Sequence, residues 1–320
     1  MATYKEIKGT NIEVLESDPS NPLDGQVWFN STDNVLRGNV GTPVVAWSTV
    51  NSLNTARTST SGAGIATAAL VVGGYSTTNI ADTESWNGSN WTEVNNLNTA
   101  RSSTGSMGTY TAALTFGGSG SPSYLSNTET WNGSNWTEVN DLNSARRALP
   151  GAGTNTAGLA IGGFEPPGTN KVESWNGSNW TETTDLNTPR YASAGAGIQT
   201  AALLIGGAGG TPKTELWNGS NWTEVNDLNQ GREALMGSGV QTSAVAYGGT
   251  TPAGAATESW NGTNWTEVND LNNGRIRAAS AGATNTSALA SGGVPAPGSP
   301  DNVALAEQFA GLTTKTFTDS

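Results

Sequence analysis

The amino-acid sequence predicts an all-β protein, a six-bladed β-propeller with four-stranded blades and a small β extension at its N-terminus. Three observations lead to this fold. A tryptophan-rich motif recurs along the chain, its copies are evenly spaced, and an incomplete copy at the start of the series complements an incomplete copy at its end. Repeats of about 40–50 residues are typical of propeller blades, so the repeat predicts the architecture.

Each repeat contains the same landmarks in the same order. A Trp-Asn-Gly-Ser-Asn-Trp motif, with Thr for Ser in the last copy, begins at Trp86, Trp131, Trp175, Trp217 and Trp260. A Gly-Gly doublet after an apolar run begins at Gly73, Gly117, Gly162, Gly206, Gly248 and Gly292. An arginine ends a turn at Arg57, Arg101, Arg146, Arg190, Arg232 and Arg275, so that successive arginines are 44, 45, 44, 42 and 43 residues apart.

Spacing within the repeat predicts four strands. The interval is 7 residues from a glutamate (Glu84 in the first repeat) to the second tryptophan, and 10 from there to the next arginine. The arginine precedes the second glycine of the doublet by 17 residues, or 18 in the last repeat, whereas 7 to 13 residues separate that glycine from the glutamate. We therefore expect one variable loop, between the second and third strands. The Asn-Gly hairpin loop should place Trp86 opposite Trp91.

These landmarks resemble the Kelch family: Gly-Gly after a hydrophobic strand, then Glu-x-aromatic, then tryptophan, then a turn ending in Ala-Arg. The resemblance covers about residues 47–310 and implies a propeller. The chain departs from the common pattern with Trp where Tyr usually follows the glutamate, and without His after the arginine. The Trp-Asn-Gly-Ser-Asn-Trp repeats are also similar to Kelch-type proteins encoded by bacteriophages, marine ones in particular.

The two ends of the series predict how the ring closes. The segment from Trp47 contains only a fourth strand, and the last repeat has Glu307 and Phe309 but no second tryptophan. We expect the strand at Trp47 to pair with the strand at Glu307–Phe309. Two alternatives remain: Phe317 could form the outer strand, or residues 11–46 could fold as a seventh, divergent blade.

The sequence divides into an attachment segment at 1–45, the propeller at 46–310 and a tail at 311–320. Within the first, Trp28 and Phe29 lie in one predicted strand of a hairpin, with Val35 and Leu36 in the other. This stretch resembles short modules of phage tail-fibre and other virion proteins, which implies attachment through Trp28 and Phe29. The alternative is a simple cap on the propeller.

Composition excludes several classes of function. The net charge of −12 disfavours nucleic-acid binding, which needs a basic surface. The absence of His and Cys removes the usual general base, thiolate metal ligands and disulfides. The N-terminus has no apolar signal-peptide core, and no stretch approaches the ~18 apolar residues of a membrane span. We expect no cofactor, no metal and no membrane insertion.

Two sets of residues are candidate binding sites. The six repeated arginines should approach the axis on one face, where a ring of them would bind carboxylates or sulfated sugars. Alternatively, each pairs with a repeat glutamate and braces the blades. The variable loops share that face, because antiparallel order puts both connections at one end of the blade. Tyr75, Tyr124 and Phe164 in these loops are candidate platforms for a sugar or a protein, or merely cover the loop backbone.

The predicted function is a non-enzymatic structural or interaction protein of a virion, as a tail fibre, adhesin or capsid decoration. Other virion proteins would bind its N-terminal segment, a host surface glycan or protein would bind the propeller, and several copies would be present per particle. One alternative is a cellular Kelch adaptor that docks another protein. A propeller enzyme is disfavoured, because a galactose-oxidase-like site needs His and a Tyr–Cys pair and the sialidase box is missing.

Overall fold

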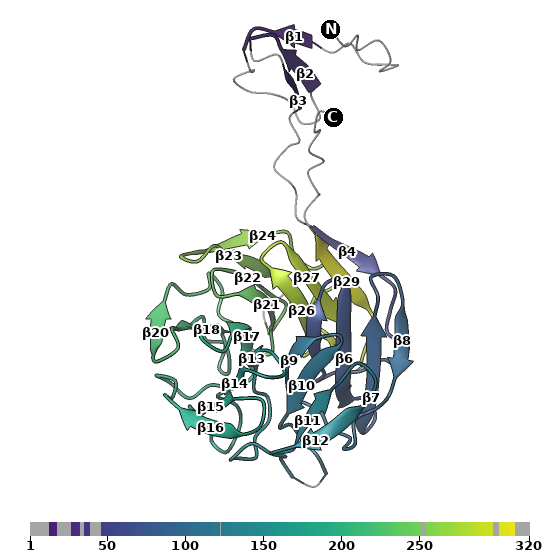
Figure 1. Ribbon diagram of the computed structural model, residues 1–320, viewed down its shortest axis with the longest axis vertical. Helices are drawn as coiled ribbons and strands as arrows, with labels where there is room; N and C mark the ends of the chain where they lie inside the picture. Colours follow the sequence, from purple (N-terminus) through teal and green to yellow (C-terminus); the bar gives the residue numbers. More distant parts are fainter. Residues whose placement is uncertain are drawn as a thin grey trace. The chain divides into compact units, whose positions relative to one another are not determined.

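The computed structural model is all-β. It describes residues 13–17, 27–32, 35–38, 46–121, 123–250, 254–296 and 301–310, and these contain no helix. Contacts divide the chain into two units, of which Val45–Ala310 is the propeller. Six four-stranded antiparallel sheets are arranged in a ring, with the innermost strands around the axis (Figure 1).

The first three blades follow one another along the chain, each from its innermost to its outermost strand. Blade 1 comprises β5 (Ser61–Ile65), β6 (Ala68–Tyr75), β7 (Asn79–Trp86) and β8 (Trp91–Val94). Blade 2 comprises β9 (Gly105–Thr109), β10 (Ala112–Phe116), β11 (Thr128–Trp131) and β12 (Trp136–Val139). Blade 3 comprises β13 (Gly151–Gly153), β14 (Gly158–Ile161), β15 (Val172–Trp175) and β16 (Trp180–Thr183).

The remaining blades repeat this order, except that the last takes its outermost strand from the start of the propeller. Blade 4 comprises β17 (Ala194–Ile198), β18 (Ala201–Ile205), β19 (Thr214–Trp217) and β20 (Trp222–Val225). Blade 5 comprises β21 (Met236–Val240), β22 (Ser243–Tyr247), β23 (Thr257–Trp260) and β24 (Trp265–Val268). Blade 6 comprises β26 (Ala279–Thr284), β27 (Ser287–Ser291), β29 (Ala306–Ala310) and β4 (Ala46–Val50), and β25 (Arg275–Ile276) pairs with β28 (Val294–Pro295) beside it.

Ring closure occurs as the sequence predicts. Strand β4 pairs antiparallel with β29, which places Trp47 opposite Phe309. The Trp47 ring packs 5.0 Å from Phe309 and 4.8 Å from Tyr247 of blade 5, measured between ring centroids. The seven-blade alternative is wrong, because the described strands before Ala46 form a separate sheet. The alternative in which Phe317 supplies the outer strand lies outside the described residues.

The tryptophan pairs close the hairpins between the third and fourth strands, as expected. Trp86 is opposite Trp91, and the same register holds in blades 2 to 5. The paired rings are 5.1–5.3 Å apart between centroids. Aromatic pairs at this separation stabilise beyond the area they bury.

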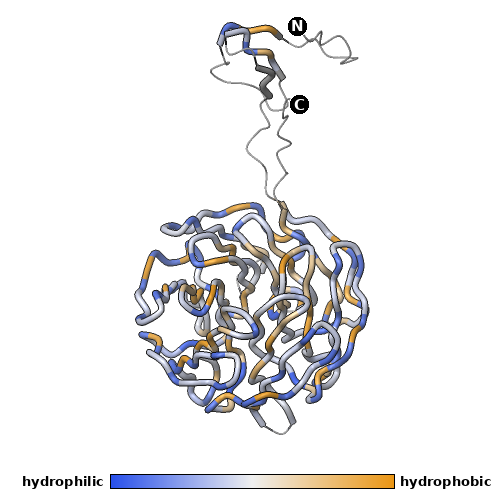
Figure 2. Tube along the Cα trace, viewed as in Figure 1, coloured by the Kyte–Doolittle hydropathy of each residue, from blue (hydrophilic) through white to orange (hydrophobic). Residues whose placement is uncertain are grey.

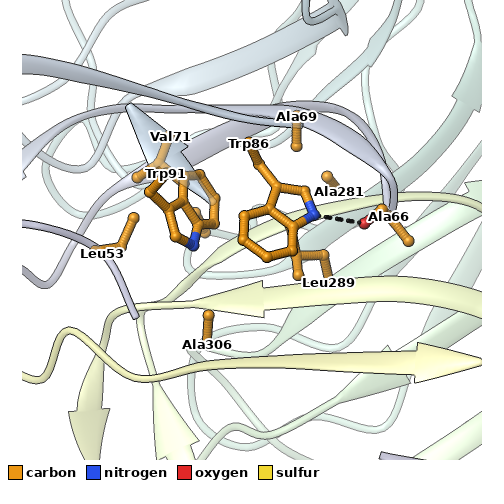
Figure 3. Packing of buried hydrophobic residues seen from close by; sticks show 10 residues of the cluster. Leu53, Ala66, Ala69, Val71, Trp86, Trp91, Ala281, Leu289 and Ala306 are labelled. Atoms are coloured by element: carbon orange, nitrogen blue, oxygen red, sulfur yellow. Dashed lines mark hydrogen bonds between the residues drawn. The ribbon is translucent and has the colours of Figure 1, made fainter. Parts of the chain in front are cut away.

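These pairs also pack one blade against the preceding one. In Figure 3, Trp86 and Trp91 of blade 1 lie in a cluster with Ala281, Leu289 and Ala306 of blade 6. Five further clusters of the same kind fill the other blade interfaces. Much of the outer edge of the propeller is hydrophilic (Figure 2). The hydrophobic core is therefore divided into six interfaces between blades.

At most of these interfaces, the second tryptophan of a blade donates a hydrogen bond to the preceding blade. Its indole nitrogen donates to a threonine hydroxyl on the preceding blade at 3.1 Å, as in the pairs Trp47–Thr257, Trp136–Thr83, Trp180–Thr128 and Trp265–Thr214. Two interfaces differ. Trp91 donates to the carbonyl of Asn51 instead, and the buried indole nitrogen of Trp222 has no partner, because Val172 occupies the position of the threonine.

The Gly-Gly doublets allow the blades to approach closely at their connections. Gly73 has a φ of 56° and Gly74 a φ of 116°, both in the left-handed region that favours glycine. The nitrogen of Gly74 donates to the carbonyl of Arg101 in the connection to the next blade. A Cβ on Gly73 would lie 2.6 Å from that carbonyl oxygen, so a side chain does not fit.

The N-terminal unit contains a three-stranded sheet. The predicted hairpin is present: β2 (Val27–Asn30) pairs antiparallel with β3 (Val35–Gly38), with Phe29 opposite Leu36. A further strand, β1 (Glu13–Leu15), pairs parallel with β2, which the hairpin motif does not reveal. Trp28 is buried and Phe29 half-buried, and the tail at 311–320 lies outside the described residues.

Candidate functional site

One face of the propeller, here called the loop face, carries both the connections between blades and the loops between second and third strands. The two sets meet in every blade. Thr58, after the first repeated arginine, pairs with Tyr75 at the start of the first loop. Arg147 pairs in the same way with Phe164. The sequence prediction that these connections share a face is therefore confirmed.

A central cavity of about 500 Å³ lies within the ring of innermost strands. Most of the residues that line it are small. Those with a charged or aromatic side chain are Arg147, Tyr191, Glu233 and Arg277, and all four precede the innermost strand of their blade. They consequently stand at the end of the cavity that opens on the loop face, here called the mouth.

A closed cycle of backbone hydrogen bonds surrounds the mouth. One residue of each blade donates its N–H to the carbonyl of the equivalent residue on the preceding blade, at 2.6–3.0 Å. These residues have φ of 51–55° although none is glycine. They are Ser59, Ser103, Ala148, Ala192, Ala234 and Arg277. A left-handed φ is uncommon in residues with a Cβ, and here it recurs once per blade.

The six repeated arginines are buried away from the mouth. Their side chains are at most 3% exposed, and each forms an ion pair with the glutamate of its own blade. In blade 2, Arg101 contacts Glu129 at 2.9 Å and donates to the carbonyl of Asn127 at 2.6 Å. Burial lowers the pKa of Arg101 from its ordinary value, and the negative charge of Glu129 opposes that shift.

The same glutamates hold the connections between blades. The second carboxylate oxygen of Glu129 accepts hydrogen bonds from the backbone and side-chain nitrogens of Asn98, both at 2.8 Å. Asn98 lies in the connection from blade 1 to blade 2, three residues before Arg101. A buried carboxylate is tolerated where a cation and further donors satisfy it. Each Arg–Glu pair thus fastens a connection to the blade that follows.

The repeated arginines are therefore not a ligand-binding ring. Arg57, Arg101, Arg146, Arg190, Arg232 and Arg275 all form these internal pairs. A ligand on the loop face does not reach guanidinium groups that are excluded from solvent. The contacts match the alternative interpretation, in which each arginine braces its blade.

Two of the three candidate aromatic residues come together at the mouth. Tyr124 and Phe164 pack edge to face with ring centroids 5.8 Å apart, and Phe164 packs similarly on Tyr191 at 4.8 Å. The guanidinium carbon of Arg147 lies 5.3 Å from the ring centroid of Tyr124 and 4.9 Å from that of Phe164. Tyr75, on blade 1, is 43% exposed and stands outside this cluster.

Sequence reasoning missed the other mouth residues, Arg147, Tyr191, Glu233 and Arg277. The signal is the position directly after the repeated arginine, which differs in every repeat although its neighbours recur. That position holds Thr58, Ser102, Arg147, Tyr191, Glu233 and Ile276. The next position is Ser or Ala in five repeats and Arg277 in the sixth.

The variable loops are shorter than the sequence intervals imply. In blade 1, Gly74 pairs with Ile80 and Tyr75 with Asn79, so only Ser76–Thr78 connects the strands. Later residues of the interval are also structural: the carbonyl of Ala81 accepts from the nitrogen of Leu97 in the next connection. The loop of blade 6 contacts that of blade 1, where the side chain of Asn302 donates to the carbonyls of Tyr75 and Ser76.

The fold and the mouth define the chain as a six-bladed β-propeller with a central cavity. No family model matches it, and no curated protein matches it. Among solved structures it is similar to one titled "Structure of YjhT", a Kelch-type protein, with a TM-score of 0.66 and 13% identity over 80% of this chain and 95% of that chain. At this identity the likeness shows the propeller fold, and the Kelch type is compatible with it. In the described part of the chain, no helix has the length and apolarity to cross a membrane.

Proposed function

We propose that the chain is a non-enzymatic recognition protein of a virion, which binds a host glycan or protein through the loop face of its propeller. It would serve as a tail fibre, adhesin or capsid decoration. The N-terminal segment would attach it to other virion proteins, in several copies per particle, with the half-buried Phe29 more accessible for this contact than the buried Trp28. The virion assignment rests on sequence motifs alone: the repeats resemble Kelch-type phage proteins, and this segment resembles short tail-fibre modules.

The observation that carries the proposal is the distribution of repeated and non-repeated residues. Arginine, glutamate, tryptophan and glycine recur at fixed spacing and serve the blades. Non-repeated side chains and loop lengths concentrate on the loop face, around Tyr75, Tyr124, Phe164 and the mouth. Recognition sites are commonly variable loops on a rigid scaffold.

Two observations support a binding role without catalysis. The sequence contains neither His nor Cys, the residues most used as general base and thiol nucleophile. The glutamates of the blade interiors are engaged: Glu129 accepts from Arg101 and Asn98 at once, so it is held as a structural carboxylate.

A loop exchange tests the proposal. Residues 76–78, 120–124, 165–168 and 297–301 are replaced by shorter Gly-Ser turns, so that the paired residues Ser119, Phe164 and Val294–Pro295, and Asn302, stay in place. Attachment to host cells or to the isolated partner should be lost, while the melting temperature changes little. Unchanged attachment would overturn the assignment to the loop face. If deletion of residues 1–40 abolished attachment instead, the N-terminal segment would be the recognition element.

A pair of exposed tyrosines provides the matched control. Tyr75 lies on the loop face and Tyr110 on the turn between β9 and β10 at the opposite face, with exposures of 43% and 46%. Tyr75→Ser should weaken attachment, and Tyr110→Ser should leave it unchanged. Antibody labelling of purified particles in the electron microscope tests the virion assignment separately, and unlabelled particles would contradict it.

A further inference from the structure

Two cations of the propeller differ from all the others. Within the described part of 46–310, eight of the ten Lys and Arg side chains form an ion pair with a carboxylate. The two without such a partner among these residues are Arg147 and Arg277. In a chain with a net charge of −12, where acidic side chains outnumber basic ones, cations that form no ion pair are unexpected.

Both of these arginines line the central cavity at its mouth. Arg147 belongs to blade 3 and Arg277 to blade 6, and these blades are opposite one another in a ring of six. Neither arginine recurs in the other blades, so neither serves the repeat. Two positive groups that line one cavity repel each other, and Glu233, the one acidic residue among the described residues of the lining, offsets only one of the two charges.

The surroundings of Arg147 orient its guanidinium group for a ligand. Tyr124 and Phe164 lie within 5.3 Å of its central carbon, which is the distance range of a cation–π contact. No hydrogen bond from the Arg147 side chain occurs among the described residues, so its N–H groups keep their donor capacity. Stacking of this kind limits side-chain motion and reduces the entropy that binding would cost.

The remaining mouth residues supply groups that suit a saccharide. Tyr191 is half-buried, packs on Phe164 and lines the cavity, so it offers an aromatic surface for a sugar ring. Ser59 and Ser103, on blades 1 and 2, add two hydroxyl-bearing residues to the lining. Glu233, which accepts a hydrogen bond from the nitrogen of Gly209 at 2.9 Å, has capacity to accept from sugar hydroxyls as well.

The volume favours a small ligand. A cavity of about 500 Å³ falls within the usual range of small-molecule sites, roughly 300–1,000 Å³. A saccharide residue with a charged group fits this space, whereas a folded protein partner would contact the loops and leave the cavity empty.

We infer that the mouth binds an acidic saccharide, whose carboxylate or sulfate groups contact Arg147 and Arg277 and whose ring packs on Tyr191. This inference rests on the proposed recognition function and names its ligand class. Arginine binds carboxylate and sulfate through paired N–H donors, so either anion satisfies the site.

Calorimetry on the full chain tests the inference with three probes: trigalacturonate, its fully methyl-esterified form, and a sulfated galactose trisaccharide. One or both acidic probes should bind, and the neutral ester should bind at least tenfold more weakly. A preference between the acidic probes distinguishes carboxylate from sulfate. Equal affinity for the ester, or no binding of either acidic probe, would overturn the inference.

Three variants locate the site. Arg147→Gln and Arg277→Gln should each weaken acidic-probe binding about tenfold or more, since each removes a charge-assisted hydrogen-bond donor. Lys213→Gln, which removes the same charge from a lysine paired with Glu224, should bind as the unmodified chain does. Affinity unchanged in both arginine variants would overturn the assignment to the mouth.

The outcome is separable from that of the proposed function. If the loop exchange abolishes attachment while the arginine variants attach normally and no acidic probe binds, the recognition function holds and the acidic-saccharide inference is wrong. If acidic probes bind at the mouth while attachment survives the loop exchange, the inference holds for the cavity and the loop-face recognition function is wrong.

Discussion

The six repeated arginines and the two arginines of the mouth are the same residue in opposite surroundings. Arg101 is excluded from solvent and is matched by Glu129, Asn127 and the connection that contains Asn98. Arg147 and Arg277 line a cavity and have no carboxylate partner among the described residues. The six recurring arginines stabilise their blades, whereas the two arginines of the mouth form no ion pair within the described part of the chain and are the residues proposed to bind a ligand.

Removal of the closing strand should have the largest effect on the repeated part. A chain that lacks residues 1–55 loses β4, and with it Trp47, the hydrogen bond to Thr257 and the fourth strand of blade 6. We expect it to be unfolded, or to unfold cooperatively at much lower temperature. A chain that lacks residues 1–40 should keep the propeller, as circular dichroism during heating would show. Equal melting temperatures for the two would refute closure by β4.

Trp131→Ala tests the packing between blades. Trp131 is 2% exposed and packs with Leu70 and Val72 of blade 1. The substitution leaves a cavity and deprives the carbonyl of Tyr110 of a donor. It should lower the free energy of unfolding by about 3–5 kcal/mol, measured by denaturant titration. A loss below about 1 kcal/mol would mean that the interface repacks without the ring.

Glu129→Gln tests the buried ion pair. The substitution keeps the shape but leaves the charge of Arg101 without a counter-ion in a buried site. We expect a loss of about 3 kcal/mol in the free energy of unfolding, the lower end for a broken buried pair, since glutamine still accepts hydrogen bonds. Glu138→Gln is the control: Glu138 is opposite Glu129 on β12 but exposed. If the two variants were equally stable, the pair would not brace the blade.

The smallest expected effect is a gain. Val172→Thr supplies the hydroxyl that the indole nitrogen of Trp222 lacks and should raise the free energy of unfolding by about 1 kcal/mol. Thr128→Val makes the reverse change at Trp180 and should lower it by about 1–3 kcal/mol. A loss of stability in Val172→Thr would show that packing of the valine outweighs the missing hydrogen bond.

The fold could be predicted from the sequence because local signals and the repeat agree. The Asn-Gly hairpins fix the register of Trp86 and Trp91, and the incomplete copies at Trp47 and Phe309 define the closing strand. The repeated Arg, Gly-Gly, Glu and Trp residues do not reveal which residues are in contact between blades. That Trp86 packs on Leu289 depends on the closed ring, which brings together two residues that are 203 positions apart in the sequence.

The candidate site could be predicted only in part. Tyr124 and Phe164 can be predicted as candidate binding residues because they are aromatic residues within the variable loops. Arg147 and Arg277 cannot be predicted in this way. Each lies next to or near a repeated arginine, and the sequence does not indicate which of the two arginines is buried. The arginine that is buried is the one that pairs with the glutamate of the third strand. This contact joins the connection between blades to the third strand, and the local sequence does not reveal it. Comparison of the repeats position by position separates the two kinds of arginine.

The hydrogen-bond cycle around the mouth has a consequence for how specificity can change. Because the N–H groups of Ser59, Ala148, Arg277 and their counterparts all donate within the cycle, the rim offers none of these N–H donors to a ligand. Discrimination there falls to side chains. The cycle accepts serine, alanine and arginine in one backbone conformation. The six residues of the cycle are therefore positions at which side chains can be exchanged while the backbone of the rim stays the same. A new ligand preference could evolve, or be engineered, by such exchanges.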